Sequence, residues 1–197
     1  YYNHKKVREL SASKEKIGLD NHFGYDIINE DNEKSSFSFF DGTFPTIYIH
    51  ENGYLNFNSG DITYFNNIYT NHFTQKRISA LMGNLINNSS DTDNHTNQGD
   101  VYIGTGSYGE LVITYNNYSA LIVDPNDNTQ LISNNYNNFQ IRLWLNDSSF
   151  GSSTTYSDDH YPKGTIQVIY GKCEYQSPLV GLSNKVTYNE LTYTPIE

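Results

Sequence analysis

The chain has 197 residues, a formal net charge of −10 at pH 7, 18 Tyr, 10 Phe and one Cys. This length allows a domain with a hydrophobic core that needs no disulfide, and Cys173 has no second cysteine in the chain to pair with. The negative charge argues against binding to a phosphate backbone, and no apolar run approaches the roughly 20 residues of a membrane span. We therefore expect neither nucleic-acid binding nor membrane insertion.

Residues 1–35 differ in composition from the rest of the chain. They contain six of the twelve Lys and Arg residues and no Pro. Their apolar pattern fits a short helix and an extended segment equally well. We expect a lead-in segment that packs on or beside the main domain at residues 36–187, followed by a C-terminal tail at residues 188–197.

From Ser36 onward, the apolar residues repeat with period two. Phe37 and Phe39 alternate with serines, and Asn52-Gly53 separates the β-rich runs 46–50 and 54–57. Because Asn and Gly both tolerate a positive φ angle, this pair predicts a β-hairpin with a type I′ turn.

Further strand-like runs follow without amphipathic helices between them. They cover residues 101–103, 111–115, 139–145 and 165–170, while residues 77–82 fit a strand or a short helix. The 26 Asn residues favour turns, and Asn-rich loops are expected after Asn84 and Asp124. This pattern predicts an all-β fold, an antiparallel β-sandwich with long loops rich in Asn, Asp and Ser.

The order and spacing of these blocks resemble nidogen-type (NIDO-like) extracellular domains, and most of all the ectodomain of the plexin-domain-containing proteins. The blocks are residues 37–42 (FSFFDG), 52–57 (NGYLNF), 77–85 (RISALMGNL), 139–143 (FQIRL) and 164–170 (GTIQVIY). The resemblance implies a secreted or surface-displayed β-sandwich that serves adhesion or matrix assembly. It supplies no catalytic residues.

Residues 104–109 match the G-x-G-x-x-G pattern of dinucleotide-binding loops. That loop requires a helix directly after it, because the pyrophosphate binds at the helix N-terminus. Here the following residues 110–115 are rich in β-branched side chains. We therefore predict a glycine-rich hairpin turn and no dinucleotide.

The acidic stretch 91–100 offers alternating oxygen ligands of the kind that calcium prefers. Asp91, Asp93 and Asp100 are the candidate ligands, although the stretch lacks the glycine and the distal glutamate of an EF-hand. A solvated acidic loop is the alternative interpretation. We expect no other cofactor, since the six His residues lack zinc-site spacing and Cys173 fits a small apolar residue.

Tyrosines beside polar loops are the candidate binding residues, because a Tyr ring combines a large apolar surface with a polar tip. These are Tyr64, Tyr69, Tyr108, Tyr118, Tyr136, Tyr156 and Tyr161. Solvent-exposed Tyr residues without a partner are the alternative. N-glycosylation sequons occur at Asn87, Asn88, Asn94, Asn117 and Asn146, a number that chance alone explains in so Asn-rich a chain.

These observations predict a non-enzymatic extracellular module for adhesion or surface assembly that acts through protein–protein contacts as a structural subunit. Its partners would be other copies of itself or another extracellular protein. A glycan-binding, lectin-like module is the alternative, and a polysaccharide hydrolase is a more remote one, because no pair of carboxylates stands out as catalytic.

Overall fold

The computed structural model describes residues 22–28, 34–58, 72–86, 99–105, 110–124, 127–145, 162–175 and 178–185. These residues are mostly β-strands, with one turn of helix at residues 72–74. The two main sheets and a small hairpin are antiparallel throughout. The predicted all-β fold is confirmed.

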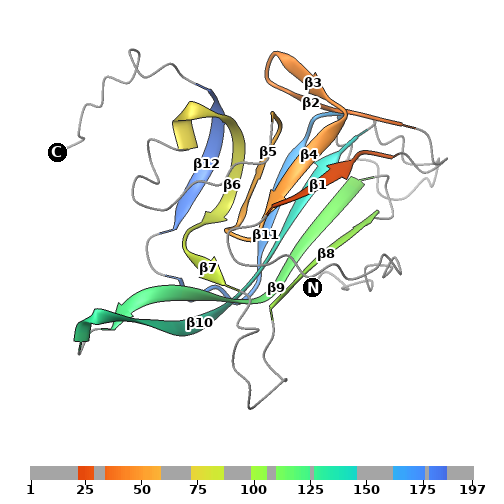
Figure 1. Ribbon diagram of the computed structural model, residues 1–197. Helices are drawn as coiled ribbons and strands as arrows, with labels where there is room; N and C mark the ends of the chain where they lie inside the picture. Colours follow the sequence, from red (N-terminus) through yellow and green to blue (C-terminus); the bar gives the residue numbers. More distant parts are fainter. Residues whose placement is uncertain are drawn as a thin grey trace.

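The first sheet has five strands in the order β1-β4-β5-β6-β12. Their bounds are β1 His22–Asp26, β4 Thr46–His50, β5 Tyr54–Asn56, β6 Lys76–Met82 and β12 Leu179–Asn184. Strands β1 and β12 are its two edges (Figure 1). Residues 22–26, in the expected lead-in segment, are therefore part of this sheet.

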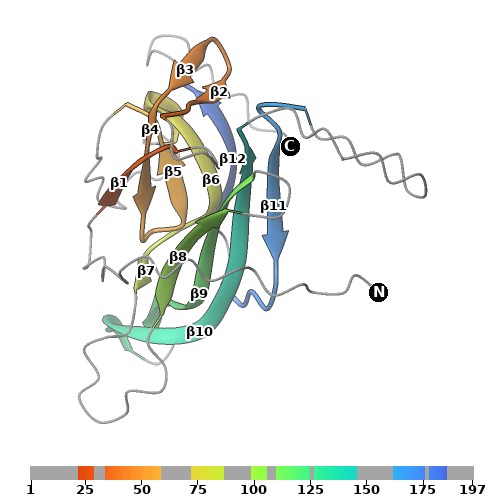
Figure 2. The same cartoon turned by 90° about the vertical axis from the view of Figure 1, so that its right-hand side faces the viewer.

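The second sheet is built on a long hairpin of two strands. These are β9 Glu110–Asp124 and β10 Asp127–Trp144, with β11 Ile166–Tyr170 beside β10 and both β7 Leu85–Ile86 and β8 Asp100–Thr105 beside β9. A separate two-stranded hairpin joins β2 Phe37–Phe39 to β3 Gly42–Phe44. Figure 2 shows the two main sheets facing each other.

One hydrophobic core fills the space between the sheets. The first sheet contributes Ile47, Ile49, Leu55, Ile78 and Ala80, and the second contributes Leu111, Ile113, Tyr115, Phe139, Ile141 and Leu143. These residues alternate along their strands with residues on the opposite face, as the period of two requires. The Tyr115 hydroxyl donates a hydrogen bond to the His50 carbonyl at 2.6 Å, which ties the two sheets together inside the core.

The β4–β5 hairpin is confirmed, but its turn differs from the predicted one. His50 pairs with Tyr54, so the loop has three residues, and of these only Gly53 has a positive φ angle, 81°. The Gly53 amide donates to the His50 carbonyl at 3.2 Å. This is a type I turn followed by a left-handed residue, the usual form of a three-residue hairpin loop.

The sequence prediction for the Asn-rich stretch after Asp124 is wrong. Residues 127–138 were expected to be a loop, and they form the first two thirds of strand β10. Pairing with the apolar strand β9 outweighs the low strand propensity of Asn at these positions. The ambiguous run 77–82 lies in strand β6.

The G-x-G-x-x-G pattern begins at the end of strand β8, which contains Gly104 and Thr105, and its residues 106–109 lie outside the described part of the chain. Strand β8 pairs antiparallel with β9, with Thr105 opposite Leu111. The next described residues, from Glu110, form a strand and not the helix whose N-terminus a bound pyrophosphate requires.

We expect Gly53→Ala to destabilise the fold by at least about 2 kcal/mol, because an added Cβ is strained at this φ angle and meets the Leu81 carbonyl. Urea unfolding of the purified protein measures the change. Gly181→Ala in β12 is the matched control, since its new Cβ would find only an ordinary contact at 3.5 Å from the His72 ring. Equal effects of the two substitutions would contradict the assigned turn.

Candidate functional site

The β9–β10 hairpin continues beyond the strands that flank it. Strand β11 pairs with β10 only at residues 139–143, and strands β8 and β7 pair with β9 only as far as residue 120. Beyond these points the hairpin has two strands, with Ile122 paired to Ile132 and Asp124 paired to Asp127. Figures 1 and 2 both show this part extending sideways at the lower end of the sandwich. We call residues 121–124 and 127–133 the arm.

The base of the arm bends because both strands carry irregularities there. Asn117 has a φ angle of 60°, and the pairing register shifts between Asn134 and Tyr136 and again between Asn137 and Phe139. The Asn138 carboxamide oxygen accepts a hydrogen bond from the Asn117 amide at 2.9 Å. Bulges of this kind bend a strand and increase its twist, and so the arm leaves the direction of the sheet.

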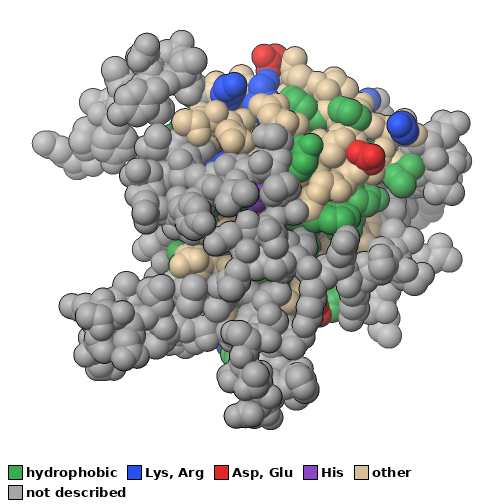
Figure 3. All heavy atoms as spheres, viewed as in Figure 1, with side chains coloured by type: hydrophobic (Ala, Val, Ile, Leu, Met, Phe, Trp, Pro, Cys, Tyr) green, Lys and Arg blue, Asp and Glu red, His purple; other side chains and the backbone are tan. Residues whose placement is uncertain are grey.

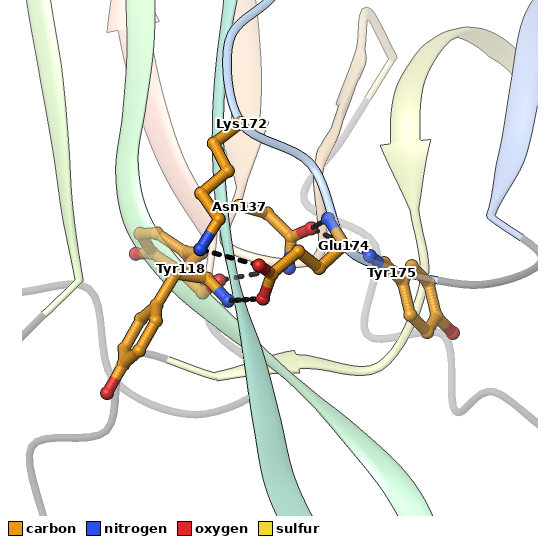
Figure 4. A network of polar contacts seen from close by, with 6 residues as sticks. Tyr118, Asn137, Lys172, Glu174 and Tyr175 are labelled. Atoms are coloured by element: carbon orange, nitrogen blue, oxygen red, sulfur yellow. Dashed lines mark hydrogen bonds and ion pairs between the residues drawn. The ribbon is translucent and has the colours of Figure 1, made fainter.

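Asn137 joins three segments at this bend. Its side chain is fully buried, and its oxygen accepts hydrogen bonds from the amides of Glu174 at 2.9 Å and Tyr175 at 3.0 Å. Its amide nitrogen donates to the Tyr118 carbonyl at 3.1 Å. Figure 4 shows this carboxamide between β9 and the segment that follows β11. One side chain therefore fixes β10 to both neighbours where the arm begins.

The segment after β11 is itself held in place on both sides. Lys172 and Glu174 form an ion pair at 2.5 Å, and the Glu174 carboxylate also accepts the Tyr136 amide at 3.3 Å. The hydrogen bond from Lys172 lowers the pKa of the Glu174 carboxyl. The Tyr175 ring lies against Gly83 so closely that a Cβ added at Gly83 would collide with the ring. The base of the arm is thus a braced polar joint.

The arm is partly apolar in sequence. Its sequence runs Leu121-Ile122-Val123 in one strand and Leu131-Ile132-Ser133 in the other. A two-stranded ribbon has no interior of its own and is marginally stable in water. Among the described residues, no further strand pairs with either edge of the arm. Such a ribbon gains stability by pairing with or packing on another surface.

A second polar cluster lies on the face of the first sheet that points away from the core. Its centre is the Tyr54 ring, which stacks on His50 at 4.1 Å and lies 4.4 Å from the Arg77 guanidinium. All three side chains are buried. A buried cation over an aromatic face is a favourable arrangement, so the cluster stabilises the sheet.

His72 and Ser79 extend this cluster and form an arrangement that could suggest catalysis. The His72 Nδ1 atom lies 2.9 Å from the Ser79 hydroxyl, and burial together with the Arg77 charge lowers the pKa of His72 to about 4. A neutral imidazole of this kind could accept a proton. However, both side chains are at most 3% exposed, and Ser79 also contacts the Met82 sulfur at 3.4 Å. We interpret the pair as a structural hydrogen bond.

The predicted tyrosine set is not brought together as one site. Tyr118 is 1% exposed and packs edge-to-face on Tyr115, so its proposed role in binding at a surface loop is wrong. Burial, with the nearby Glu51 carboxylate, raises its pKa. Tyr136 is half-buried at the base of the arm. Tyr64, Tyr69, Tyr108, Tyr156 and Tyr161 lie outside the described residues.

The predicted calcium and glycan positions fall mostly outside the described residues as well. These are Asp91, Asp93, Asn87, Asn88, Asn94 and Asn146. Asp100 begins strand β8 and accepts a hydrogen bond from the Tyr102 hydroxyl at 2.9 Å, while Asn117 is half-buried in the bulge of β9. Within the described ranges, no three His, Cys, Asp or Glu side chains cluster closely enough to hold a metal ion.

The described surface on the side of β1–β4 mixes hydrophobic and polar side chains. Figure 3 shows hydrophobic groups in the upper right of this face and single charges of both signs around them. Lys76 illustrates the pattern: it pairs with Asp41 and lies 5.8 Å from the centre of the Phe44 ring. No helix in the described part of the chain is long and apolar enough to cross a membrane.

Sequence reasoning missed the arm and its joint. The signal that could have found them is the pair of apolar runs, Leu121-Ile122-Val123 and Leu131-Ile132, on either side of Pro125-Asn126. Two β-rich runs around a turn dipeptide indicate a hairpin. The high Asn content of the second strand concealed this signal.

Comparison of this chain with family models, with curated proteins and with solved structures yielded no match. The candidate site therefore stands on its geometry alone.

We expect Asn137→Ala to destabilise the protein by about 2–4 kcal/mol, because three backbone groups lose their hydrogen-bond partner in a buried place. Urea unfolding followed by tyrosine fluorescence measures the loss. Asn116→Ala, at an exposed position of the same strand pair, is the control and should change stability by less than about 0.5 kcal/mol. A neutral Asn137→Ala would contradict the role of this joint.

The buried His72 should make stability depend on pH. The pKa of His72 is lowered in the folded state. As the pH falls from about 6.5 to about 4, His72 is therefore protonated in the unfolded chain before it is protonated in the folded one. Stability should fall by about 3 kcal/mol over this window, because one pKa unit corresponds to about 1.4 kcal/mol and the ring is buried. Denaturant titrations at successive pH values measure this slope, and His72→Gln should flatten it. A slope unchanged by the substitution would assign the effect to other groups.

Proposed function

We propose that this chain is a non-enzymatic extracellular module for adhesion or surface assembly, and that it acts as a structural subunit through protein–protein contacts. The observation that carries the proposal is the arm, a two-stranded ribbon that extends past the sandwich on a braced joint. A fold that needed only its own core would gain nothing from such an extension.

Two further features support this proposal. Three pairs of buried polar side chains in and beside the first sheet contact each other: His50 stacks on Tyr54, Arg77 lies over the Tyr54 ring, and His72 lies within hydrogen-bond distance of Ser79. These contacts favour a structural role for the groups over a reaction centre. The resemblance of the sequence blocks to nidogen-type extracellular domains points to adhesion or matrix assembly outside the cell. Both features favour contact over catalysis.

Shortening the arm tests the proposal. Replacing residues 122–132 with Asn-Gly joins Leu121 to Ser133, which already face each other, through a two-residue turn. In cells that make the protein, we expect the unaltered chain to be accessible to added protease and to a membrane-impermeant crosslinker, and to appear in crosslinked assemblies. The shortened chain should be exported but recovered as the free form.

A matched control separates loss of contact from loss of folding. Ile28→Asp changes an exposed apolar residue of the body, 42% accessible, and should leave the crosslinked assemblies intact. The thermal unfolding of the shortened chain should show one cooperative transition. Protection of the unaltered chain inside the cell, or equal crosslinking of the shortened one, would overturn the proposal.

A further inference from the structure

The loop between strands β4 and β5 contains the single Asn-Gly pair of the chain, Asn52-Gly53. An asparagine followed by glycine loses its side-chain amide readily, because glycine has no side chain to hinder attack by its own backbone nitrogen. Here the pair is buried, and Asn52 is only 5% exposed. Its reactivity is therefore controlled by the structure of the loop.

The fold requires both members of this pair. Gly53 has a φ angle of 81°, and a Cβ added there would lie 2.4 Å from the Leu81 carbonyl oxygen. The Asn52 carboxamide oxygen accepts a hydrogen bond from the Leu85 amide at 3.2 Å. Another residue in place of Gly would be strained, and an apolar residue in place of Asn would leave a buried amide without its acceptor. The chain thus carries a reactive pair because its structure needs one.

In the folded chain, hydrogen bonds hold the pair in an unreactive geometry. The Gly53 amide donates to the His50 carbonyl at 3.2 Å, and the Gly53 carbonyl accepts the Leu81 amide at 3.1 Å. The Asn52 carbonyl accepts the Gly83 amide at 3.2 Å. Attack on the side chain would require the Asn52 carboxamide to turn onto the Gly53 nitrogen and to give up its own hydrogen bond. The closed loop therefore opposes the reaction.

We propose that Asn52 is a self-modification site, protected while the β4–β5 loop is closed and deamidated when the loop opens. The Gly53 nitrogen attacks the Cγ atom of Asn52 and forms a cyclic succinimide. The bond between Cγ and Nδ2 breaks, and the side-chain nitrogen leaves as ammonia with the proton that the Gly53 amide gives up. Water then adds to one of the ring carbonyls, and the ring opens to aspartate or isoaspartate. Water is the sole co-reactant.

Either product disturbs the passage of the chain from one sheet to the other. Strand β6 of the first sheet continues into β7, which pairs with β9 of the second sheet (Figure 1). Asn52 binds this passage through the amides of residues 83 and 85. Aspartate would place a charge in a buried position next to Glu51, which is itself 0% exposed. Isoaspartate would lengthen the main chain by one carbon and displace the Gly53 carbonyl.

The loop therefore makes prolonged unfolding irreversible. A chain that opens briefly closes again before the slow reaction takes place. A chain that stays open is converted and no longer regains the native contacts of the loop. This inference is independent of the proposed function, because it depends on the β4–β5 loop and not on the arm.

Incubation of the purified full chain in native buffer and in guanidinium chloride, at one pH and temperature, tests the protection. Peptide mapping by mass spectrometry follows the conversion of Asn52 to its two products. We expect deamidation to be at least about tenfold slower in native buffer, because only the open fraction of the chain reacts. Asn52→Gln is the control in guanidinium chloride: its longer side chain must close a larger ring, and it should show no conversion over the same time.

A mild core substitution tests whether opening controls the reaction. Ile49 in β4 is fully buried and pairs with Leu55 across the hairpin. Ile49→Val removes one buried methylene group and should raise the rate of deamidation in native buffer at least about twofold. Ile28→Val makes the same change at a 42% exposed position and should leave the rate unchanged. In guanidinium chloride both variants should react as fast as the unaltered chain.

Refolding tests the consequence. Chains kept in guanidinium chloride until Asn52 is converted, and then diluted, should unfold at a lower urea concentration than chains diluted at once. Three results would overturn the proposal: equal rates in native buffer and guanidinium chloride, an unchanged rate in an Ile49→Val protein of lowered stability, and converted chains that regain full stability. None of these results bears on the arm, so the crosslinking test of the proposed function is decided separately.

Discussion

The carboxamide of Asn137 is the point on which the shape of this molecule depends. It satisfies two amides of the segment after β11 and one carbonyl of β9, and it is itself fully buried in β10. A carboxamide suits this place because it offers an acceptor and a donor at once, without a charge to desolvate. Without it, the bulged ladder would leave backbone groups buried and unpaired, and the direction of the arm would no longer be defined.

The core and the polar clusters show two different ways in which this chain stabilises its sheets. Between the sheets, aliphatic and aromatic side chains alternate with period two and exclude water. On the outer face of the first sheet, His50, Tyr54 and Arg77 are just as deeply buried but are held by stacking and charge. Buried polar side chains in this sheet are therefore held by contacts with one another, while those between the sheets are held by apolar packing.

The sequence alone was sufficient to predict the all-β class and several of the strands, but not the arm. Alternation at Phe37 and Phe39, the Asn52-Gly53 pair and the run 139–145 are local patterns, and each led to a strand or hairpin that the structure contains. The strand character of residues 127–138 depends on pairing with β9, which no local propensity reveals. Tyr118 was misjudged for a similar reason: beside polar neighbours in sequence, it is turned inward by the bulge at Asn117. Bulges decide which face a side chain joins, and they leave little trace in composition.

The bend at the base of the arm has a mechanical consequence. A load applied to the tip of a straight hairpin would run along its strands and act on the whole ladder of hydrogen bonds with β8 and β11 in shear. Here the ribbon turns before it reaches those strands (Figure 2), so tension first acts across the bend. The few hydrogen bonds around Asn137 would yield before the sandwich does, and the arm would lengthen while the core stays folded. A load on the arm would therefore act on the joint at Asn137 before it acted on the two sheets.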